Sequence, residues 1–379
     1  MGNKREEGLN ILFVAECDWV NSVIFDLHIL AERMSLKGHT VYAVDFAPGD
    51  NDSNSGIIHI THQLYDKAWV TVRRPGNMKS KLLSTLVPTT AAVLKAFREW
   101  EIDVVVLYSG LALGWQATLA ARARGIPVVC RVVDRRRYLW AWPYSELSAM
   151  AESFTFRHAA RILALTPNYA DYAVKLGADR RRVSVLNFPV DLKLFKPAPG
   201  PASHDIVWVG HFYPWGGLEL LVEQMPAILQ AVPDARLVLY GSGTEQGEAM
   251  VRRAVTRAGL QEAVLFKGRV PFKELPAVIA RAGVCVNIVP DTPATRDLFA
   301  AKIPQYMACG RPVVSSETPG NMRTIPHYAG VAFARNASRV ADLITVLLAV
   351  KPLADEAGRV ARQFAVDHFD ADKIADEFE

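Results

Sequence analysis

The sequence has few cysteines, no long apolar run and almost no excess of either charge. Its four cysteines, Cys17, Cys130, Cys285 and Cys309, are widely separated, which excludes a CxxC pair and a zinc-finger spacing. Such cysteine usage fits a reducing cytoplasm. No stretch approaches the ~18 consecutive apolar residues of a membrane-spanning helix. The nine histidines show no metal-ligand spacing, so the sequence predicts a cytoplasmic protein that needs no metal and no cofactor.

The 43 Lys and Arg residues nearly balance the 39 Asp and Glu residues in a chain of 379. Half of the residues are hydrophobic, which excludes a disordered chain, and the length suits two domains of ordinary size. Residues 1–200 carry a net charge of +6, whereas residues 201–379 carry −2. The first half is too weakly basic to indicate nucleic-acid binding. It suits an anionic acceptor or an anionic membrane surface.

Short β-rich runs alternate with helical patterns through both halves of the chain, which predicts parallel βαβ units. The runs that predict strands are residues 10–14, 41–46, 103–107, 127–133, 161–165, 206–209, 235–240, 264–267, 284–288 and 312–315. Residues 196–201 contain three prolines and a glycine and predict a semi-rigid linker. We therefore expect two tandem Rossmann-like, doubly wound α/β domains: residues 1–195 and 205–360, joined by the linker 196–204.

Ligands of doubly wound sheets bind at the carboxyl ends of the strands, and the second half has small residues at those positions. Gly210 and Gly216 follow the first predicted strand, and residues 241–243 (GSG) follow the second. Small residues let backbone N–H groups approach a phosphate. Arg296 and Lys302 lie near the start of a short predicted helix, where their charges would suit an anionic diphosphate. Taken alone, each glycine turn is explained equally well by a tight strand-to-helix connection.

Several segments, in this order, resemble family 4 glycosyltransferases with the GT-B fold. They are LNFPVDLKLFKP, VGHFYPWGGLELL, YGSG, FKGRVPFKELP and KIPQYMACGRPVV, and the resemblance covers essentially the whole chain. It implies transfer of a sugar from a nucleotide-diphosphate donor, with retention of configuration and without a bound metal. It also implies a donor site on the second domain, an acceptor site on the first, and a final helix (361–379) that packs back on the first domain.

The resemblance implies roles for residues that match the family's positions. The family's two carboxylates, eight residues apart, correspond to Asp297, expected to hold the donor sugar, and Gln305, expected to bind the ribose. Lys302 and Arg296 are expected to bind the diphosphate, and Asp134, Asp297 and Lys302 are the candidate catalytic residues. The remaining donor-binding candidates are Gly210, His211, Gly216, Gly241, Ser242, Gly243, Arg269, Val270, Leu298, Phe299 and Ala300. The acceptor-binding candidates are Glu16, Asp18, Trp19, Tyr108 and Arg135.

Four positions depart from the family's pattern. His211 and Gly216 stand where the family has a phosphate-binding Arg and Lys, Val133 stands where many members have His, and Gln305 replaces a carboxylate. Removing one charged donor typically costs about 3 kcal/mol of transition-state stabilisation. These departures keep a second function open, that of a catalytically impaired GT-B-like binding or assembly protein. A GT-B epimerase or phosphorylase fits the motif spelling less well.

Two further motifs have ordinary explanations beside functional ones. Asp50-Asn51-Asp52 resembles a DxD metal motif, but its polar surroundings favour a turn. The aromatic run 138–144 follows the basic run 135–137. We assign about half of the prior probability for this run to packing in the core. Sugar stacking and shallow contact with the inner face of the membrane share the rest. The expected partners are thus a nucleotide sugar, a glycan or lipid-linked acceptor, and a peripheral membrane surface, but no nucleic acid.

Overall fold

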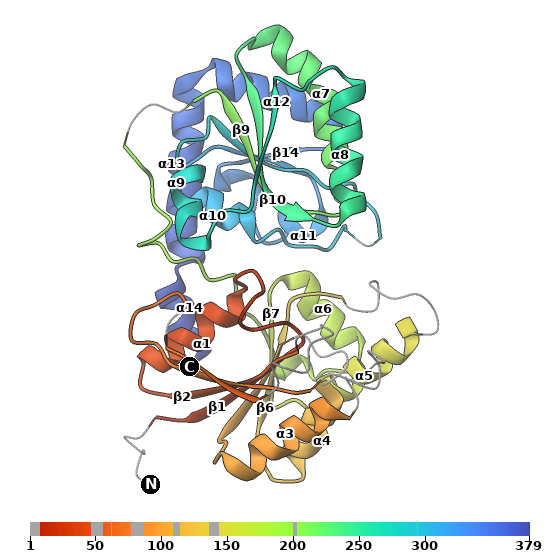
Figure 1. Cartoon of the computed structure of the whole chain (residues 1–379), viewed down its shortest axis with the longest axis vertical. Coiled ribbons are helices and arrows are strands. Elements are labelled where there is room, and N and C mark those ends of the chain that lie inside the picture. The colour runs from red at the N-terminus through yellow and green to blue at the C-terminus, as the bar shows by residue number, and fades with distance from the viewer. Residues whose placement is uncertain are drawn as a thin grey trace. The chain divides into compact units, whose positions relative to one another are not determined.

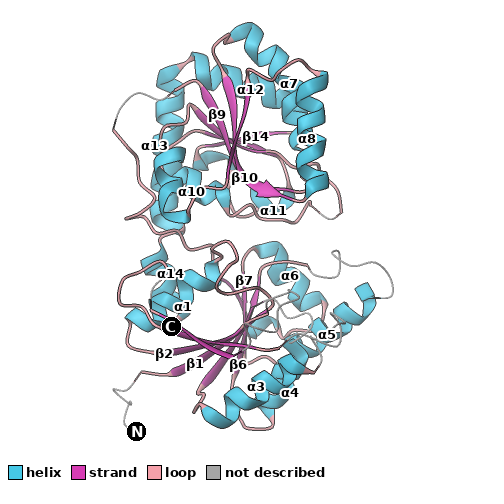
Figure 2. Ribbon diagram, viewed as in Figure 1, coloured by secondary structure: helices cyan, strands magenta, loops and turns pink. Residues whose placement is uncertain are grey.

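The computed structural model describes residues 8–46, 56–61, 63–76, 87–108, 114–135, 144–199, 203–293 and 295–379. The chain forms two compact units (Figure 1). The first unit holds the residues up to Pro189 together with Asp372–Glu379, and the second unit holds Val190–Ala371. Each unit is built on a mainly parallel sheet with helices on both of its faces (Figure 2). The predicted class of two Rossmann-like α/β domains is confirmed.

The first unit has an eight-stranded sheet with the order β3-β4-β2-β1-β5-β6-β7-β8. Its strands are β1 (Asn10–Ala15), β2 (Thr40–Val44), β3 (Gly56–Ile60), β4 (Val70–Arg74), β5 (Val104–Tyr108), β6 (Val128–Val132), β7 (Arg161–Ala164) and β8 (Val183–Val185). Its helices are α1 (Asp26–Leu36), α3 (Pro88–Glu99), α4 (Gly114–Arg122), α5 (Tyr144–His158), α6 (Pro167–Lys175) and the short η3 (Arg180–Arg182). Only the β3–β4 pair at the edge is antiparallel. The side chains of β1 are buried on both faces, as a central parallel strand requires.

The second unit has a six-stranded parallel sheet with the order β11-β10-β9-β12-β13-β14. Its strands are β9 (Asp205–Phe212), β10 (Arg236–Gly243), β11 (Val264–Gly268), β12 (Val284–Asn287), β13 (Val313–Ser316) and β14 (Val331–Ala334). Its helices are α7 (Leu218–Ala231), α8 (Glu245–Arg257), α9 (Leu275–Ile279), α10 (Lys302–Ala308), α11 (Pro319–Met322), α12 (Ala337–Ala349) and α13 (Lys351–His368), with η4 (Phe272–Glu274) and η5 (His327–Ala329). The direction of chain winding reverses between β9 and β12, so this is the switch point at which doubly wound sheets bind ligands.

The core of the second unit forms where α7, α8 and α12 cover one face of its sheet. Apolar side chains recur along α7 at helical spacing, and Leu218, Leu221, Val222 and Met225 are all buried. They pack against side chains of β9, β10, β12 and β13 in one continuous cluster. α7 begins after Gly217, whose left-handed conformation (φ 70°) favours glycine. The backbone therefore turns sharply at the carboxyl end of β9, which is the switch point.

The two units divide at a different place from the predicted linker. The structural division falls between Pro189 and Val190, and the described linker residues belong to the second unit. All of α13 also belongs to the second unit. Residues 361–371 therefore belong to the second unit, whereas the resemblance predicts that 361–379 pack on the first. The terminal helix α14 (Ala371–Phe378) lies mostly in the first unit. The chain thus passes between the units twice.

Charge pairs and apolar contacts attach α14 to the first unit. Lys37, directly after α1, forms ion pairs with Asp376 (2.6 Å) and with Glu379, and Arg33 on α1 pairs with Asp372. The apolar side of α14 is buried, and Phe378 stacks on Phe13 with ring centroids 6.3 Å apart. The amphipathic sequence of α14 therefore supplies both the charged and the apolar residues of this contact.

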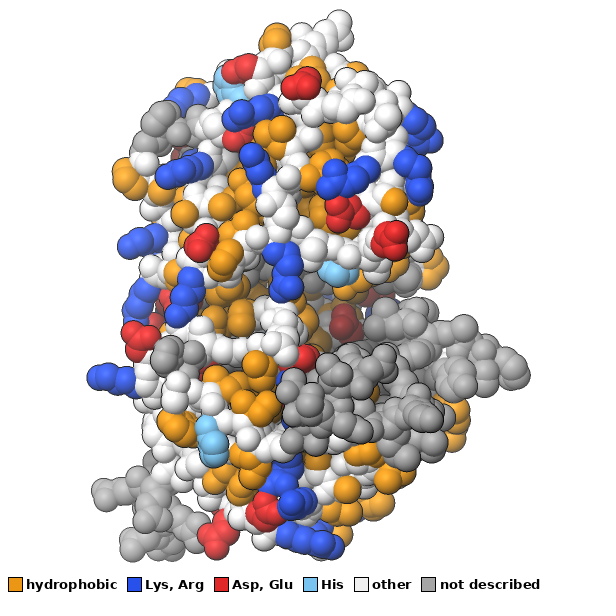
Figure 3. Space-filling view, viewed as in Figure 1, with side chains coloured by type: hydrophobic (Ala, Val, Ile, Leu, Met, Phe, Trp, Pro, Cys, Tyr) orange, Lys and Arg blue, Asp and Glu red, His pale blue; other side chains and the backbone are white. Residues whose placement is uncertain are grey.

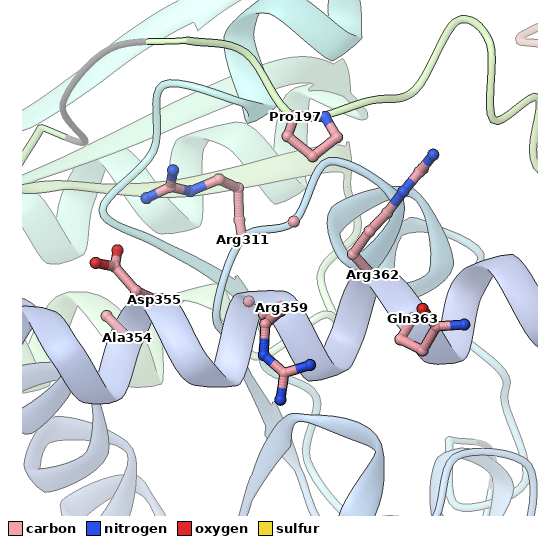
Figure 4. Close-up of a pocket in the computed structure, with 9 residues that line it drawn as sticks. Pro197, Arg311, Ala354, Asp355, Arg359, Arg362 and Gln363 are labelled. Carbon is pink, nitrogen blue, oxygen red and sulfur yellow. The ribbon is translucent and has the colours of Figure 1, made fainter.

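A cavity of about 370 Å³ lies where α13 crosses the turn after α10 (Figure 4). Its lining includes Arg311, Asp355, Gly358 and Arg362. A side chain at Gly358 would place its Cβ 2.2 Å from the Gly310 carbonyl oxygen, so glycine permits this close helix packing. Arg311 lies two residues before the start of β13. The cavity is therefore at the amino edge of the sheet, opposite the edge that holds the glycine turns.

The surface carries mixed charges. On the coloured part of the face in Figure 3, Lys and Arg side chains alternate with acidic and hydrophobic ones and form no continuous basic patch. Within the described ranges, no helix is both long enough and apolar enough to cross a membrane.

Candidate functional site

Gly210, Gly241 and Gly243 lie inside two paired strands rather than in turns after them. β9 and β10 run three residues past their predicted ends, so Gly210 pairs with Gly241 and His211 pairs with Ser242. A Cβ at Gly241 would lie 1.7 Å from the Gly210 carbonyl oxygen, and φ is +141° at Gly241. A Cβ at Gly243 would lie 2.3 Å from the Phe212 carbonyl oxygen. These glycines are therefore required by the close approach of two strands, which exposes bare backbone at the carboxyl edge.

Lys302 extends from the first turn of α10 to this glycine floor. Its Nζ lies 2.8 Å from where a Cβ of Gly210 would be, and 4.4 Å from the centroid of the Trp208 ring. Burial lowers the pKa of Lys302 to about 7, and no acidic group contributes to that pKa. A cation held over an indole without a carboxylate partner is stabilised only partly. The site therefore presents an incompletely neutralised ammonium group to any anion bound on the floor.

Hydrogen bonds from neighbouring elements hold the segment that contains Asp297, Leu298, Phe299 and Ala300. The amide of Gly320 donates to the carbonyl of Arg296 (2.8 Å), and the amide of Ala300 donates to the Asn321 side chain (3.2 Å). A Cβ at Gly320 would lie 2.5 Å from the backbone of Asp297. The segment is therefore fixed in place by α11, even though its own secondary structure is irregular.

A buried polar cluster connects α11 with the strands beneath it. Asn287, Ser315 and Asn321 are each at most 1% exposed. The side-chain amide of Asn287 donates to the Ser315 hydroxyl (3.2 Å), and the amide of Asn321 donates to the same oxygen (3.4 Å). Buried polar groups that satisfy one another restrict the local geometry. This cluster orients Asn321 toward the amide of Ala300.

The remaining donor candidates differ in how firmly they are placed. Gln305 lies one turn after Lys302 on α10 and is 9% exposed. Arg296 is half-exposed, and its guanidinium lies 3.6 Å from the carboxylate of Asp291. Arg269, followed by Val270, comes after Gly268 at the end of β11 and is exposed. Lys302 is thus the cation that lies over the glycine floor, whereas Arg296 pairs with an acid of its own loop.

The end of β9 and the connection after it have a feature that the sequence patterns did not reveal. The rings of His211, Tyr213 and Trp215 contact one another in succession, with centroids 4.3 Å and 4.6 Å apart. The His211 and Tyr213 rings are tilted by 50°, whereas those of Tyr213 and Trp215 are stacked. Gly216 closes the turn by donating its amide to the carbonyl of Tyr213 (2.9 Å). Burial, together with the charge of Arg269, lowers the pKa of His211. His211 is therefore mainly neutral at pH 7. The sequence signal for this row of rings was the spacing of two residues between them.

In the first unit, the structure contradicts an acceptor-binding role for Trp19. Its side chain is 1% exposed and packs edge-on against His28, with ring centroids 4.9 Å apart. Asp18 is committed to its own loop, because its carboxylate accepts from the amides of Val20 and Asn21 and pairs with Arg74. These residues fix the β1–α1 connection, and neither presents a free group to a ligand.

Tyr108 likewise belongs to a buried network. Its hydroxyl donates to Asp26, which also pairs with Arg131 at 2.9 Å. Both Asp26 and Arg131 are 1% exposed, and Arg131 also donates to the carbonyl of Leu186. Burial and the neighbouring carboxylate raise the pKa of Tyr108 well above its ordinary value. The sequence patterns missed Asp26 and Arg131 because each occurs within an otherwise ordinary helix or strand pattern.

The other acceptor candidates follow adjacent strands. Glu16 follows β1, and Asp134 lies two residues after β6 and is close enough to raise the pKa of Tyr108 at the end of β5. Because these strands are neighbours in the sheet, their carboxyl ends bring Glu16, Tyr108 and Asp134 to one edge. The guanidinium of Arg135 lies 5.2 Å from the ring centroid of Tyr172.

Some predicted features lie outside the described residues. They are the turn at 50–52, Arg136 and Arg137 of the basic run, and the aromatic residues 138–143. Across the described ranges, no group of three or more His, Cys, Asp or Glu side chains is arranged to hold a metal ion.

Comparison with known proteins identifies relatives of both units. The model "Glycosyl transferase 4-like domain" matches residues 28–188, and the model "Glycosyl transferases group 1" matches residues 203–349. The chain is 24% identical to a phosphatidylinositol N-acetylglucosaminyltransferase protein of Arabidopsis thaliana, over 84% of this chain and 69% of that protein. It is 28% identical to a GDP-mannose-dependent alpha-mannosyltransferase of Mycobacterium tuberculosis, over 86% of this chain and 83% of the relative.

Solved structures share the fold of the whole chain. Anabaena HepE in complex with UDP and glucose matches with a TM-score of 0.77 at 18% identity, covering 98% of both chains. Sucrose-phosphate synthase from Thermosynechococcus elongatus matches with a TM-score of 0.77 at 20% identity, covering 98% of this chain and 97% of that one. The two family models match one α/β unit each, in the order that the GT-B fold requires. The chain therefore belongs to the GT-B glycosyltransferases and resembles family 4.

Proposed function

We propose that this glycosyltransferase transfers a sugar from a nucleotide-diphosphate donor to a glycan, lipid-linked or small-molecule acceptor, with retention and without a metal ion. The observation that carries the proposal is the Lys302 ammonium, which lies over the glycine floor of β9 and β10 without a carboxylate partner. A diphosphate on that floor would supply the missing negative charge. This interaction compensates for the absent cations at His211 and Gly216.

The other roles follow from the same arrangement. Asp297 and the backbone of residues 298–300 hold the donor sugar, Gln305 binds the ribose, and Arg269-Val270 contacts the base. As the bond between the anomeric carbon and the diphosphate oxygen breaks, the acceptor oxygen forms the new glycosidic bond. The acceptor's proton passes to the departing phosphate, whose developing charge Lys302 stabilises. Asp134 at the carboxyl edge of the first sheet orients the acceptor hydroxyl.

The names of several relatives suggest an acceptor class. They describe proteins acting on phosphatidylinositol, 2-deoxystreptamine and D-inositol 3-phosphate, which all contain a polyhydroxylated six-membered ring. We propose an acceptor with such a ring, either free, in a glycan or linked to a lipid. A lipid-linked acceptor would require peripheral contact of this cytoplasmic protein with the inner face of a membrane. Sedimentation with anionic vesicles, compared with neutral ones, tests that contact.

Calorimetry with a panel of nucleotide diphosphates and nucleotide sugars tests the donor site. Lys302→Ala is expected to weaken donor binding roughly 10- to 100-fold, because a charge-assisted contact contributes about 1.5–3 kcal/mol. Lys351→Ala is the matched control, since Lys351 is an exposed lysine of the same unit that pairs with Asp355. Equal binding by all three proteins, or no binding of any nucleotide, would defeat the proposal.

The alternative function is that of a catalytically impaired GT-B-like binding or assembly protein. The observation that favours it is the combined loss of charged or catalytic groups at Val133, His211, Gly216 and Gln305. Turnover separates the two proposals. Release of free nucleotide from a donor in the presence of a cell-extract acceptor pool, absent in Lys302→Ala, would exclude the impaired protein. Donor binding without turnover under the same conditions would favour it.

A further inference from the structure

Three successive rings at the end of β9 and in the loop after it form an exposed, uncharged surface at the ligand edge of the second sheet. We name His211, Tyr213 and Trp215 the ring ladder. Tyr213 and Trp215 are 43% and 45% exposed, and their rings are only 9° from parallel. Phe212, between His211 and Tyr213, is 4% exposed and packs in the core. Alternation along the chain thus places the three rings outside the core while Phe212 anchors their backbone.

The ring ladder extends from the glycine floor toward the segment that contains Asp297. It starts at His211, directly after Gly210, where Lys302 lies. It ends beside Gly217, where a Cβ would lie 2.7 Å from the Pro290 ring. The carbonyl of Pro290 in turn accepts a hydrogen bond from the Thr295 hydroxyl. The loop after β9 is therefore packed against the loop that leads to Asp297.

We propose that the ring ladder binds one face of the acceptor's sugar or cyclitol ring, with Trp215 as the main contact. This inference rests on the proposed function. The C–H face of a saturated ring is apolar, and a flat aromatic surface removes it from water while the hydroxyl groups stay at the edge. Neutral His211 adds a ring nitrogen that exchanges hydrogen bonds with such hydroxyls without introducing charge.

The position of the ring ladder favours the acceptor over the donor base. The donor's base is expected at Arg269-Val270 after β11, which is the edge strand of the sheet. Trp215 is at the other end of the ring ladder, two residues before Gly217, which packs against Pro290 in the loop after β12. The acceptor oxygen must meet the anomeric carbon of the sugar held by Asp297. A ring bound beside that sugar lies on the Trp215 side of the floor.

Fluorine NMR of protein labelled with 5-fluorotryptophan tests ring binding without requiring turnover. The chain has eight tryptophans, so Trp215→Phe assigns the Trp215 resonance. We expect methyl α-D-glucopyranoside or myo-inositol, at about 50 mM to saturate a millimolar contact, to shift that resonance. Trp69, 49% exposed in the first unit, is the matched control and its resonance should not move.

Kinetics with a saturating donor and an extract acceptor pool provide the second readout. Trp215→Ala is expected to raise the half-saturating acceptor concentration about five- to tenfold. The dissociation constant of the donor should stay unchanged, and Trp215→Phe should restore most of the loss. Trp69→Ala should behave as the unmodified protein does. A fall in the rate at saturating acceptor, with no change in half-saturation, would contradict an acceptor contact.

The outcomes separate this inference from the proposed function. A Trp215 resonance that responds to neither ring probe overturns the inference, as does one that responds only to UDP or GDP. A response only to vesicles of phosphatidylglycerol and phosphatidylcholine overturns it too, because Trp215 would then be a membrane contact. Failure of the proposed function would instead appear as no donor binding and no turnover in the unmodified protein, whatever the NMR result.

Discussion

Donor binding should take up a proton at Lys302. Burial lowers the pKa of Lys302 to about 7 in the unliganded protein, with no acidic group to oppose the shift. A bound diphosphate would favour the charged form and raise this pKa. About nine tenths of the lysine is already charged at pH 6 and about one tenth at pH 8. Uptake on binding is therefore expected to be about 0.1 proton at pH 6 and about 0.9 at pH 8.

The protonation equilibrium of Lys302 also sets the affinity of the protein for the donor. Because only the charged lysine pairs with the diphosphate, the dissociation constant of the donor should rise about tenfold between pH 6 and pH 8. A nucleotide sugar is the ligand of choice, since its diphosphate is esterified at both ends and does not titrate in this range. Calorimetry in two buffers with different ionisation enthalpies gives the proton number directly. Burial and the charge of Arg269 lower the pKa of His211, so His211 is already neutral at pH 8, where the uptake by Lys302 is largest.

Two substitutions make the result decisive. Lys302→Arg keeps a permanent charge, so its donor affinity should be independent of pH with almost no proton uptake. Lys302→Met removes the titrating group and should bind the donor weakly at every pH. The reasoning is refuted if the unmodified protein takes up fewer than about 0.2 protons at pH 8, or if Lys302→Met takes up as many as the unmodified protein.

Three further predictions concern stability. His28 has its pKa lowered to about 4 by burial, so the folded protein should lose about 3 kcal/mol as pH falls from 6.5 to 4, and His28→Gln should remove that dependence in denaturant titrations. Arg131→Met leaves Asp26 buried without its ion-pair partner and should cost about 3–5 kcal/mol of unfolding free energy, much of it recovered in the double variant with Asp26→Asn. Gly241→Ala places a Cβ against the Gly210 carbonyl and should lower the melting temperature by at least about 4 °C. Gly259 also has a positive φ but has open space around it, so Gly259→Ala should lower the melting temperature by less.

The alternating pattern of apolar runs predicted the architecture well, because buried parallel strands must be rich in β-branched residues. It missed β4, whose Arg73 and Arg74 resemble a surface segment. Both are about 5–6% exposed, and their charges are met by Glu99 and Asp45. A single sequence does not disclose such long-range partners. Tertiary pairing therefore hid this strand from a pattern-based prediction.

The site was predicted unevenly for a similar reason. Lys302 was identified because its helix matches a family segment, whereas its position over Trp208, far earlier in the chain, could not be predicted from the sequence. Trp19 was misassigned because a tryptophan in a loop at a strand's end suggests a ligand contact, yet it is buried against His28. The sequence analysis did not predict the ring ladder, although His211, Tyr213 and Trp215 occur at every second position.

The double passage of the chain between the units has a consequence for dissecting the protein. The second unit is one uninterrupted stretch, Val190–Ala371, whereas the first needs two separate pieces of chain. The two passages meet at a single place, because Val190 donates to the Phe369 carbonyl (2.7 Å) and accepts from the Ala371 amide (3.0 Å). Truncation after Pro189 would deprive Arg33 and Lys37 of the acids that α14 supplies. A free-standing first unit therefore calls for a circular permutation or a grafted terminal helix, whereas the second unit can be excised with two simple cuts.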